Sequence, residues 1–235
     1  MGYSIKCILS ISIYFCLITP QLTFSQNTNE AIEPSVKKSD AIDLLKGGTL
    51  NAWKVPSAHW HIEEDHIIAY TGDEQLDIPE WLYTKEQFDD FVFTCELKLT
   101  GDNRRNTGIY YRVNTFTFEN YQGNKSFEAA SGYEFDVAHN RRYLGSLGDW
   151  YARPSLRILP DTAIVNQVYK TDEWNRFTLR ARGNRLEYWI NGIKVLDYID
   201  NDPKASRKGF IGFQIHDGSV MKIECRNIRV MPLKP

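Results

Sequence analysis

Two carboxylates separated by a single residue are the feature of this sequence that most clearly points to chemistry. They are Glu134 and Asp136, and the intervening and preceding residues are Phe135 and Tyr133. Side chains alternate between the faces of an extended strand, so both carboxylates are expected on one face and both aromatic rings on the other. Like charges repel and are costly to bury, so such a pair is more typical of a functional site than of a scaffold.

Two further segments place polar groups on one face of a predicted strand. Residues 209–216 bring Gln214 and His216 to the same face, and residues 108–112 do so with Tyr110 and Arg112. Three such strands predict a polar surface of substrate size across a sheet.

Composition limits the class of protein. The chain has 235 residues, of which 42% are hydrophobic and 13% aromatic, and its formal net charge is -2. This is enough apolar material for a large core. Nucleic acid binding requires concentrated basic patches, so we expect no nucleic acid partner.

The N-terminus has the pattern of a secretory signal peptide over residues 1–25. Lys6 precedes an apolar run from Cys7 to Ile18, and Thr23 and Ser25 provide small residues at a cleavage site. A bilayer span needs about 20 apolar residues, and this run is shorter. We expect a periplasmic or secreted protein without a membrane span after cleavage, and a lipid anchor at Cys16 is the weaker alternative.

Only Cys95 and Cys225 remain after removal of the signal peptide. An exported chain with two cysteines can form one disulfide. Two buried free thiols that pack as small apolar groups are the alternative. The spacing does not match a structural zinc site.

We expect the rest of the chain to consist of two segments. Residues 26–40 form a flexible polar leader, and residues 41–235 form a single domain. Short runs rich in β-branched and aromatic residues alternate with turn residues, which predicts an all-β sandwich. The predicted strands are 58–63, 66–71, 91–99, 108–113, 132–137, 155–158, 175–182, 185–190, 193–199, 209–215 and 220–230.

Turns, loops and short helices complete this prediction. Asn191-Gly192 is the clearest hairpin turn, and residues 182–185 form a second. Short helices are expected at 41–45 and 86–89. Residues 114–131 and 139–153 lack a clean period and are expected to form long loops over the edge of the sheet that carries the carboxylates.

The order of these motifs resembles the 3-keto-disaccharide hydrolase domain family from about residue 41 to the end. The matching segments are residues 44–48 with Trp53, 60–62, 91–96, 106–112, 132–136, 173–175, 191–192, 209–216 and 226–228. The resemblance implies a concanavalin A-like jelly roll of two antiparallel sheets with a concave face. It also implies activity on 3-keto glycosides, as some members have.

The residues can be fitted to that chemistry. A ketone at carbon 3 of a sugar acidifies the hydrogen on carbon 2, and its removal by a base allows the glycosidic oxygen to leave from carbon 1. Glu134 or His216 could act as the base, and Arg112 could stabilise the developing oxyanion. Asp136 could orient His216 or Arg112, or help bind a divalent metal, whose presence the sequence leaves open.

Other polar and aromatic residues are candidates for binding the sugar. Hydrogen bonds to hydroxyl groups are expected from Asn106, Tyr110, Tyr151 and Gln214. Trp81 and Trp150 are predicted to lie in loops and to stack on a sugar ring.

Three alternatives stay open at this stage. A lectin-like module would bind a glycan on the same face without cleaving it. An ordinary glycosidase would use Glu134 and Asp136 as its two carboxylates, although the motif of jelly-roll glucanases is absent. A protein-interaction domain would use the polar face for contacts with a partner protein. The oligomeric state is not predicted.

Overall fold

The computed structural model describes residues 31–119 and 125–234. The predicted signal peptide, with Cys7 and Cys16, lies outside the described residues, as does the part of the leader before residue 31. Within the described ranges, helices are all too short or too polar to cross a membrane.

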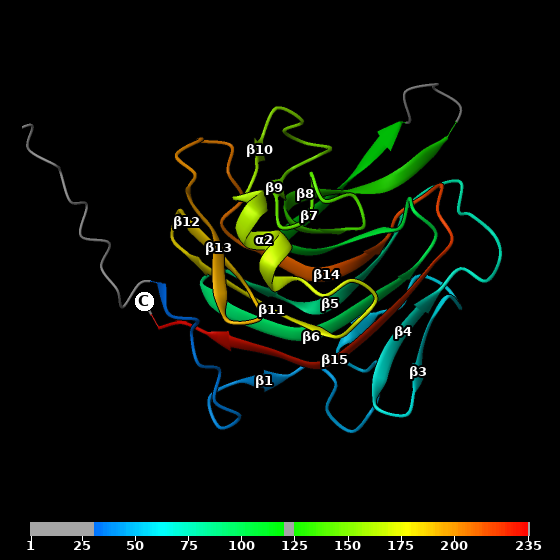
Figure 1. Cartoon of the computed structure of the whole chain (residues 1–235), viewed down its shortest axis with the longest axis horizontal. Helices are drawn as coiled ribbons and strands as arrows, with labels where there is room; N and C mark the ends of the chain where they lie inside the picture. The colour runs from blue at the N-terminus through cyan, green and yellow to red at the C-terminus, as the bar shows by residue number, and fades with distance from the viewer. Residues whose placement is uncertain (1–30, 120–124, 235) are drawn as a thin grey trace, which may run out of the picture.

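Two antiparallel sheets lie one above the other in this part of the chain (Figure 1). This confirms the predicted all-β sandwich of jelly-roll type. The larger sheet contains, in spatial order, β13 (Ile193–Ile199), β12 (Arg185–Ile190), β11 (Asn175–Arg182), β6 (Phe91–Gly101), β15 (Met221–Pro232), β4 (His66–Tyr70) and β3 (Trp60–Glu63), with β1 (Ile42–Asp43) paired to β15. The second contains β10 (Arg157–Ile158), β9 (Leu147–Gly148), β8 (Ser126–Ala138), β7 (Asn106–Glu119), β14 (Gly209–Ile215), β5 (Glu80–Phe88) and β2 (Trp53–Lys54).

The core between the sheets follows from the alternation of apolar residues along the strands. On β6, Phe91, Phe93 and Leu97 point inward and are fully buried. On β8, Tyr133 and Phe135 do the same from the opposite sheet, as predicted. Their burial forces the intervening residues of β8 onto the outer, concave face of the second sheet.

Both predicted hairpin turns are confirmed. Asn191 and Gly192 join β12 to β13 with φ values of 50° and 92°. Positive φ at both central residues is the requirement that Asn-Gly meets at low cost. Residues 183 and 184 join β11 to β12.

The predicted loop at 114–131 is wrong, because β7 continues to Glu119 and β8 begins at Ser126. The two strands extend as an arm in which Phe118 pairs with Phe127 (Figure 1). Residues 115–118 alternate threonine and phenylalanine, which is a strand pattern despite its polar character.

Three other local predictions are corrected. The helix expected at 86–89 is the end of β5, a strand that the sequence analysis did not predict. Residues 41–45 contain β1 rather than a helix. Helix α2 (Thr162–Val168) was not predicted, although Asp161 caps it by accepting hydrogen bonds from two backbone N–H groups.

The described end of the leader lies against the outer face of the larger sheet. The indole of Trp189 donates to the carbonyl of Ala31 at 3.0 Å, and the hydroxyl of Thr178 donates to Glu33 at 2.6 Å. On β6 and β15, Cys95 and Cys225 are both buried free thiols, which is the second of the two alternatives for this pair.

Candidate functional site

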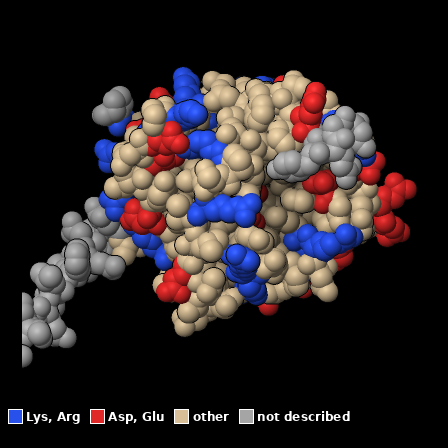
Figure 2. All heavy atoms as spheres, turned by 90° about the horizontal axis from the view of Figure 1, so that it is seen from above, with Lys and Arg blue, Asp and Glu red and all other residues tan. Residues whose placement is uncertain are grey.

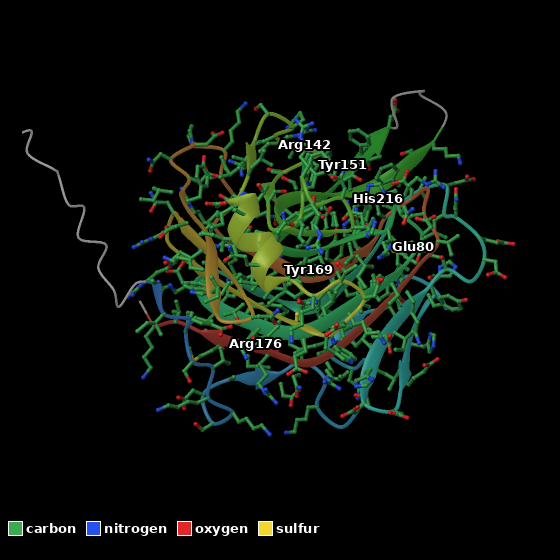
Figure 3. The ribbon with its side chains drawn as sticks, viewed as in Figure 1. Glu80, Arg142, Tyr151, Tyr169, Arg176 and His216 are labelled. Atoms are coloured by element: carbon green, nitrogen blue, oxygen red, sulfur yellow. The ribbon has the colours of Figure 1, made fainter. Side chains whose placement is uncertain are left out.

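A pocket of about 320 Å³ opens on the outer face of the second sheet. Its floor comes from β7, β8 and β14, and its wall from the segment between residues 139 and 158. The lining residues are Asn106, Tyr110, Glu134, Asp136, Tyr143, Trp150, Tyr151, Pro154, Arg157, Gln214 and His216. Figure 3 shows Tyr151 and His216 on this side of the molecule, whereas Arg176 lies on the opposite sheet. The pocket therefore brings together every predicted site residue except Arg112 and Trp81.

A glycine on the neighbouring strand makes room for the first carboxylate. Gly108 on β7 pairs with Asp136, and Tyr110 pairs with Glu134. A Cβ atom at Gly108 would lie 2.1 Å from Oε1 of Glu134 and 2.5 Å from its Cγ. The Glu134 carboxylate thus lies directly over the backbone of β7, where only glycine leaves enough space.

The two carboxyl groups are buried without enough hydrogen bonds to replace the water that they lose. Glu134 is 3% exposed and Asp136 2% exposed, and one oxygen of each has no hydrogen-bond partner within the protein. Burial raises the pKa of Glu134 to about 8, against the opposing effects of the Tyr110 hydroxyl and the Trp150 indole. Burial and then the charge of Glu134 raise the pKa of Asp136 well above its ordinary value. The two carboxyl groups titrate as a pair, so the charge of whichever one ionises keeps the other protonated.

Other unpartnered polar atoms line the same pocket. The side-chain oxygens of Asn106 and Gln214 are buried and have no hydrogen-bond partner within the protein, and the buried indole nitrogen of Trp150 lies near Glu134 without a well-formed hydrogen bond. Buried polar atoms are normally paired, so several exceptions in one pocket indicate a polar ligand. Sugar hydroxyl groups, which both donate and accept, would match this mixed set of donors and acceptors.

His216 lies at the rim with 42% of its side chain exposed. Its Nδ1 is 2.7 Å from the carbonyl oxygen of Asp217. A carbonyl only accepts, so the proton of the neutral ring is on Nδ1 and the lone pair is on Nε2. His216 can therefore accept a proton or a hydrogen bond at Nε2.

A buried ion network fixes the wall that carries Trp150 and Tyr151. Nε of Arg153 donates to Asp149 at 2.8 Å, and another of its nitrogens donates to Asp200 at the same distance. The carboxylate of Asp149 also accepts from the backbone N–H groups of residues 132 and 152. These contacts tie the wall to β8 and to the end of β13.

The Trp150 ring packs closely on the floor of the pocket. A Cβ atom at Gly148 would lie 2.7 Å from this ring. The edge of Tyr143 contacts it, with ring centroids 6.2 Å apart. The ring is thus held in place next to Glu134, which pairs with Gly148 across the sheet.

The predicted role of Arg112 is corrected, because this residue does not line the pocket. The pairing of β7 with β8 shifts register between Tyr111 and Asn114, and Arg112 has a φ of 51°. This bulge breaks the strict alternation on which the prediction relied. The guanidinium instead donates to the carbonyls of Asp89 and Gly183 and to the carboxylate of Asp90 at 2.7–2.8 Å.

Trp81 lies on β5 rather than in a loop and does not line the pocket. It pairs with Gln214 across the sheet. Its ring contacts those of Tyr110, Phe127 and Tyr151 at centroid distances of 5.7–6.0 Å. Trp81 thus supports two pocket residues from below and anchors the β7–β8 arm.

Three lining residues were missed by the sequence analysis: Tyr143, Pro154 and Arg157. Tyr143 and Pro154 lie in irregular backbone of the segment between residues 139 and 158, and Arg157 begins the two-residue strand β10, so no periodicity predicts which of these side chains converge. The aromatic and basic content of that segment was the available signal. The Arg157 guanidinium lies 4.4 Å from the centroid of the Trp150 ring.

The pocket does not offer a ready metal site. Among the described residues, no group of three or more His, Cys, Asp and Glu side chains is arranged to hold a metal ion. Glu134, Asp136 and His216 therefore do not fit the suggested ligand set, and we derive no step through a metal.

Residues 40–231 match the profile of the 3-keto-alpha-glucoside-1,2-lyase-like domain. The chain belongs to this family. The match spans both sheets and includes all residues that line the pocket, and it confirms the resemblance found in the sequence. No curated protein matches the chain. Family membership indicates a carbohydrate-active protein, with either glycoside cleavage or carbohydrate binding as its function.

Solved structures resemble the chain in fold. A Parabacteroides distasonis protein assigned as a glycosyl hydrolase aligns with a TM-score of 0.60 and 20% identity, over 86% of this chain and 100% of that one. The carbohydrate recognition domain of Emp47p aligns with a TM-score of 0.54 and 14% identity, over 84% and 99% of the two chains. At these identities the likeness establishes the fold alone.

Proposed function

We propose that this protein is an exported enzyme that cleaves 3-keto glycosides by elimination and hydration. The observation that carries the proposal is the buried, uncompensated carboxylate pair of Glu134 and Asp136 in a polar pocket. Enzymes raise the pKa of a carboxylate toward the working pH when it must take up or release a proton. A scaffold gains nothing from such a pair.

The reaction begins with transfer of the hydrogen on carbon 2 of the sugar, as a proton, to the base. The electron pair forms an enolate with the ketone at carbon 3. The enolate collapses to a double bond between carbons 1 and 2 as the bond from carbon 1 to the glycosidic oxygen breaks. That oxygen takes a proton from an acid and leaves as an alcohol. Water then adds its oxygen to carbon 1 and a proton to carbon 2.

The geometry suggests which residue takes each role. Glu134, whose carboxylate lies in the space above Gly108, is assigned as the base, and Asp136, which stays protonated while its neighbour is ionised, is the acid for the leaving oxygen. The Trp150 indole N–H is a donor for the enolate oxygen, and the side-chain NH2 groups of Gln214 and Asn106, which line the pocket, are further candidates. These groups take the place of Arg112. His216, at the rim, is the second candidate for the base.

An ordinary glycosidase mechanism fits the pocket less well. Such enzymes place their two carboxylates on either side of the bond that is cleaved. Glu134 and Asp136 are two residues apart on the same face of β8, so both approach a bound sugar from the same side. One-sided approach suits removal of a proton from carbon 2 and protonation of the neighbouring oxygen.

The test compares a 3-keto disaccharide with its unoxidised parent. We expect release of the free sugar from the keto compound only, loss of release in Glu134→Gln, and retention in the control Glu187→Gln. Equal cleavage of both disaccharides would contradict the elimination. Binding of a disaccharide without cleavage in any of the three proteins would favour a carbohydrate-binding module.

A further inference from the structure

Arg157 is a cation at the rim of the pocket that the elimination does not use. It lines the pocket and is exposed, and its guanidinium carbon lies over the Trp150 ring, 4.4 Å from the centroid. Within the described ranges it forms no ion pair. Arg153 is the contrasting case, because Asp149 and Asp200 neutralise it inside the wall.

The cation–π contact with Trp150 gives Arg157 a defined position without neutralising its charge. The ring face restricts the long side chain, and the N–H groups at the edge of the guanidinium remain available as donors. A planar guanidinium held in this way binds a carboxylate or sulfate through two parallel hydrogen bonds. The entropic cost of ordering the side chain is then small when a ligand binds.

A second exposed arginine, Arg142, does not line the pocket but is next to a residue that does. The guanidinium of Arg142 lies 5.7 Å from the centroid of the Tyr143 ring, and Tyr143 contacts the Trp150 ring that carries Arg157. Figure 2, which looks onto this face, shows Lys and Arg side chains across its middle. The rim therefore carries an unpaired cation, Arg157, whereas the floor of the same pocket carries the carboxylates.

This separation of charge has a consequence for substrates. An anionic group at the floor would face Glu134 and Asp136 and be repelled as soon as one ionises. At the rim the same group would meet unpaired positive charge. A substrate that carries an anionic substituent away from its reacting carbons would match both ends of the pocket.

We propose that the rim of the pocket, through Arg157 with Arg142 as a second cation, selects glycosides that carry an anionic substituent. The substituent is a carboxylate, as in a uronic acid, or a sulfate ester. This specificity rests on the proposed function, since it concerns the substrate of that same pocket.

The experiment measures binding and cleavage separately. Binding of methyl glucoside, methyl glucuronide and a sulfated methyl glucoside to the inactive Glu134→Gln protein is followed by calorimetry. Cleavage of the corresponding 3-keto glycosides by the wild type gives kcat/KM for each. We expect the anionic probes to bind about tenfold or more tightly than the neutral one, and kcat/KM to follow the same order. Comparison of the glucuronide with the sulfated probe decides between the two anions.

Substitution at the rim tests the assignment to Arg157. In Arg157→Gln the ratio of anionic to neutral kcat/KM is expected to fall about tenfold, and Arg157→Glu to reverse the preference. Arg226→Gln is the matched control, because Arg226 also lies over a tryptophan, Trp174 at 4.1 Å, but on the other sheet. The control is expected to leave the ratio unchanged.

Two negative results have different meanings. Equal binding and cleavage of neutral and anionic probes, with the same ratio in Arg157→Gln as in the wild type, would overturn the anion site and leave the elimination intact. Absence of binding and cleavage with every probe would contradict the proposed function, and the anion site with it. Melting temperatures of the variants establish that each one folds.

Discussion

Two buried glutamates, one on each sheet, show how differently the same residue type is used in this molecule. Glu187 on β12 is 1% exposed, and Glu134 on β8 is 3% exposed. Glu187 accepts from Lys194 at 2.7 Å and from Arg180, with Arg185 at 3.7 Å. Glu134 has no cationic partner among the described residues, and one of its oxygens has no hydrogen bond.

The difference separates a scaffold charge from a functional one. Burial of a carboxylate is tolerated when cations and donors replace the lost water, as they do around Glu187. Around Glu134 the replacement is incomplete, so burial instead raises the pKa of the group to about 8. The larger sheet uses its buried charge to hold strands together, and the second sheet keeps its buried charge available for a ligand.

The strongest test of the difference between the two glutamates is to neutralise each of them in turn. Glu134→Gln is expected to lower kcat by about 10²–10⁴-fold, because the amide cannot take up the proton. Glu187→Gln is expected to leave kcat unchanged and to cost about 1–2 kcal/mol of unfolding free energy, because two cations lose a charged partner. Steady-state kinetics and denaturant unfolding of both variants measure the two effects. A Glu134→Gln protein with near wild-type kcat would refute the role of this residue.

A second comparison sets Arg112 against Arg157. Arg112 is fully buried and donates to Asp89, Asp90 and Gly183. Arg112→Gln is expected to lower the free energy of unfolding by about 2–3 kcal/mol, because these acceptors lose their donor. Arg157→Gln, at an exposed site, is expected to cost less than about 0.5 kcal/mol. Urea unfolding of both proteins is the measurement, and equal losses would show that Arg112 is not a scaffold residue.

The space that Gly108 leaves for Glu134 gives a test of geometry alone. In Gly108→Ala the new Cβ would lie 2.1 Å from Oε1 of Glu134, so the carboxylate must move. We expect kcat/KM to fall about 10–100-fold, because a small displacement of a catalytic group is costly. The control is the same substitution in the Glu134→Gln background, where no further loss is expected. A further loss of similar size there would show that Gly108 acts by another route.

The smallest expected effect is on the pH dependence of stability. Glu134 and Asp136 have raised pKa values in the folded protein, so the folded state holds protons that the unfolded state releases at neutral pH. Their contribution is therefore fully present below the ordinary carboxyl pKa and is lost as pH rises through about 8. Glutamine does not ionise, so the Glu134→Gln protein avoids the part of this loss of stability that is due to Glu134. Its melting temperature is expected to exceed that of the wild type by a few degrees at pH 9. Identical pH profiles of melting temperature would contradict the raised pKa.

Much of this fold follows directly from local sequence patterns. The alternation of Tyr133 and Phe135 with Glu134 and Asp136 predicted which face each would occupy, because β8 is regular over these residues. The Asn191-Gly192 turn was predicted correctly because the turn requires positive φ at both residues, which asparagine and glycine adopt at low cost.

The failures have equally specific causes. Arg112 was predicted to line the pocket because side chains were assumed to alternate strictly along this strand. The strand contains a bulge that the amino-acid sequence does not reveal. The strand at Glu80–Phe88 was missed because its second half, with Lys85, Glu86 and Gln87, is exposed and polar. Tyr143 reaches the pocket from an irregular turn and Arg157 from the two-residue strand β10, and in both cases long-range contacts rather than local periodicity determine where the side chain points.

The most direct test of the account follows the hydrogen on carbon 2 of the sugar. A 3-keto disaccharide that carries deuterium at this carbon is cleaved in ordinary water, with Glu134→Gln and protein-free solution as controls. Proton removal by Glu134 predicts a primary isotope effect on kcat/KM and hydrogen in place of deuterium in the released keto sugar. Complete retention of deuterium without an isotope effect would contradict the elimination and with it the role assigned to the carboxylate pair.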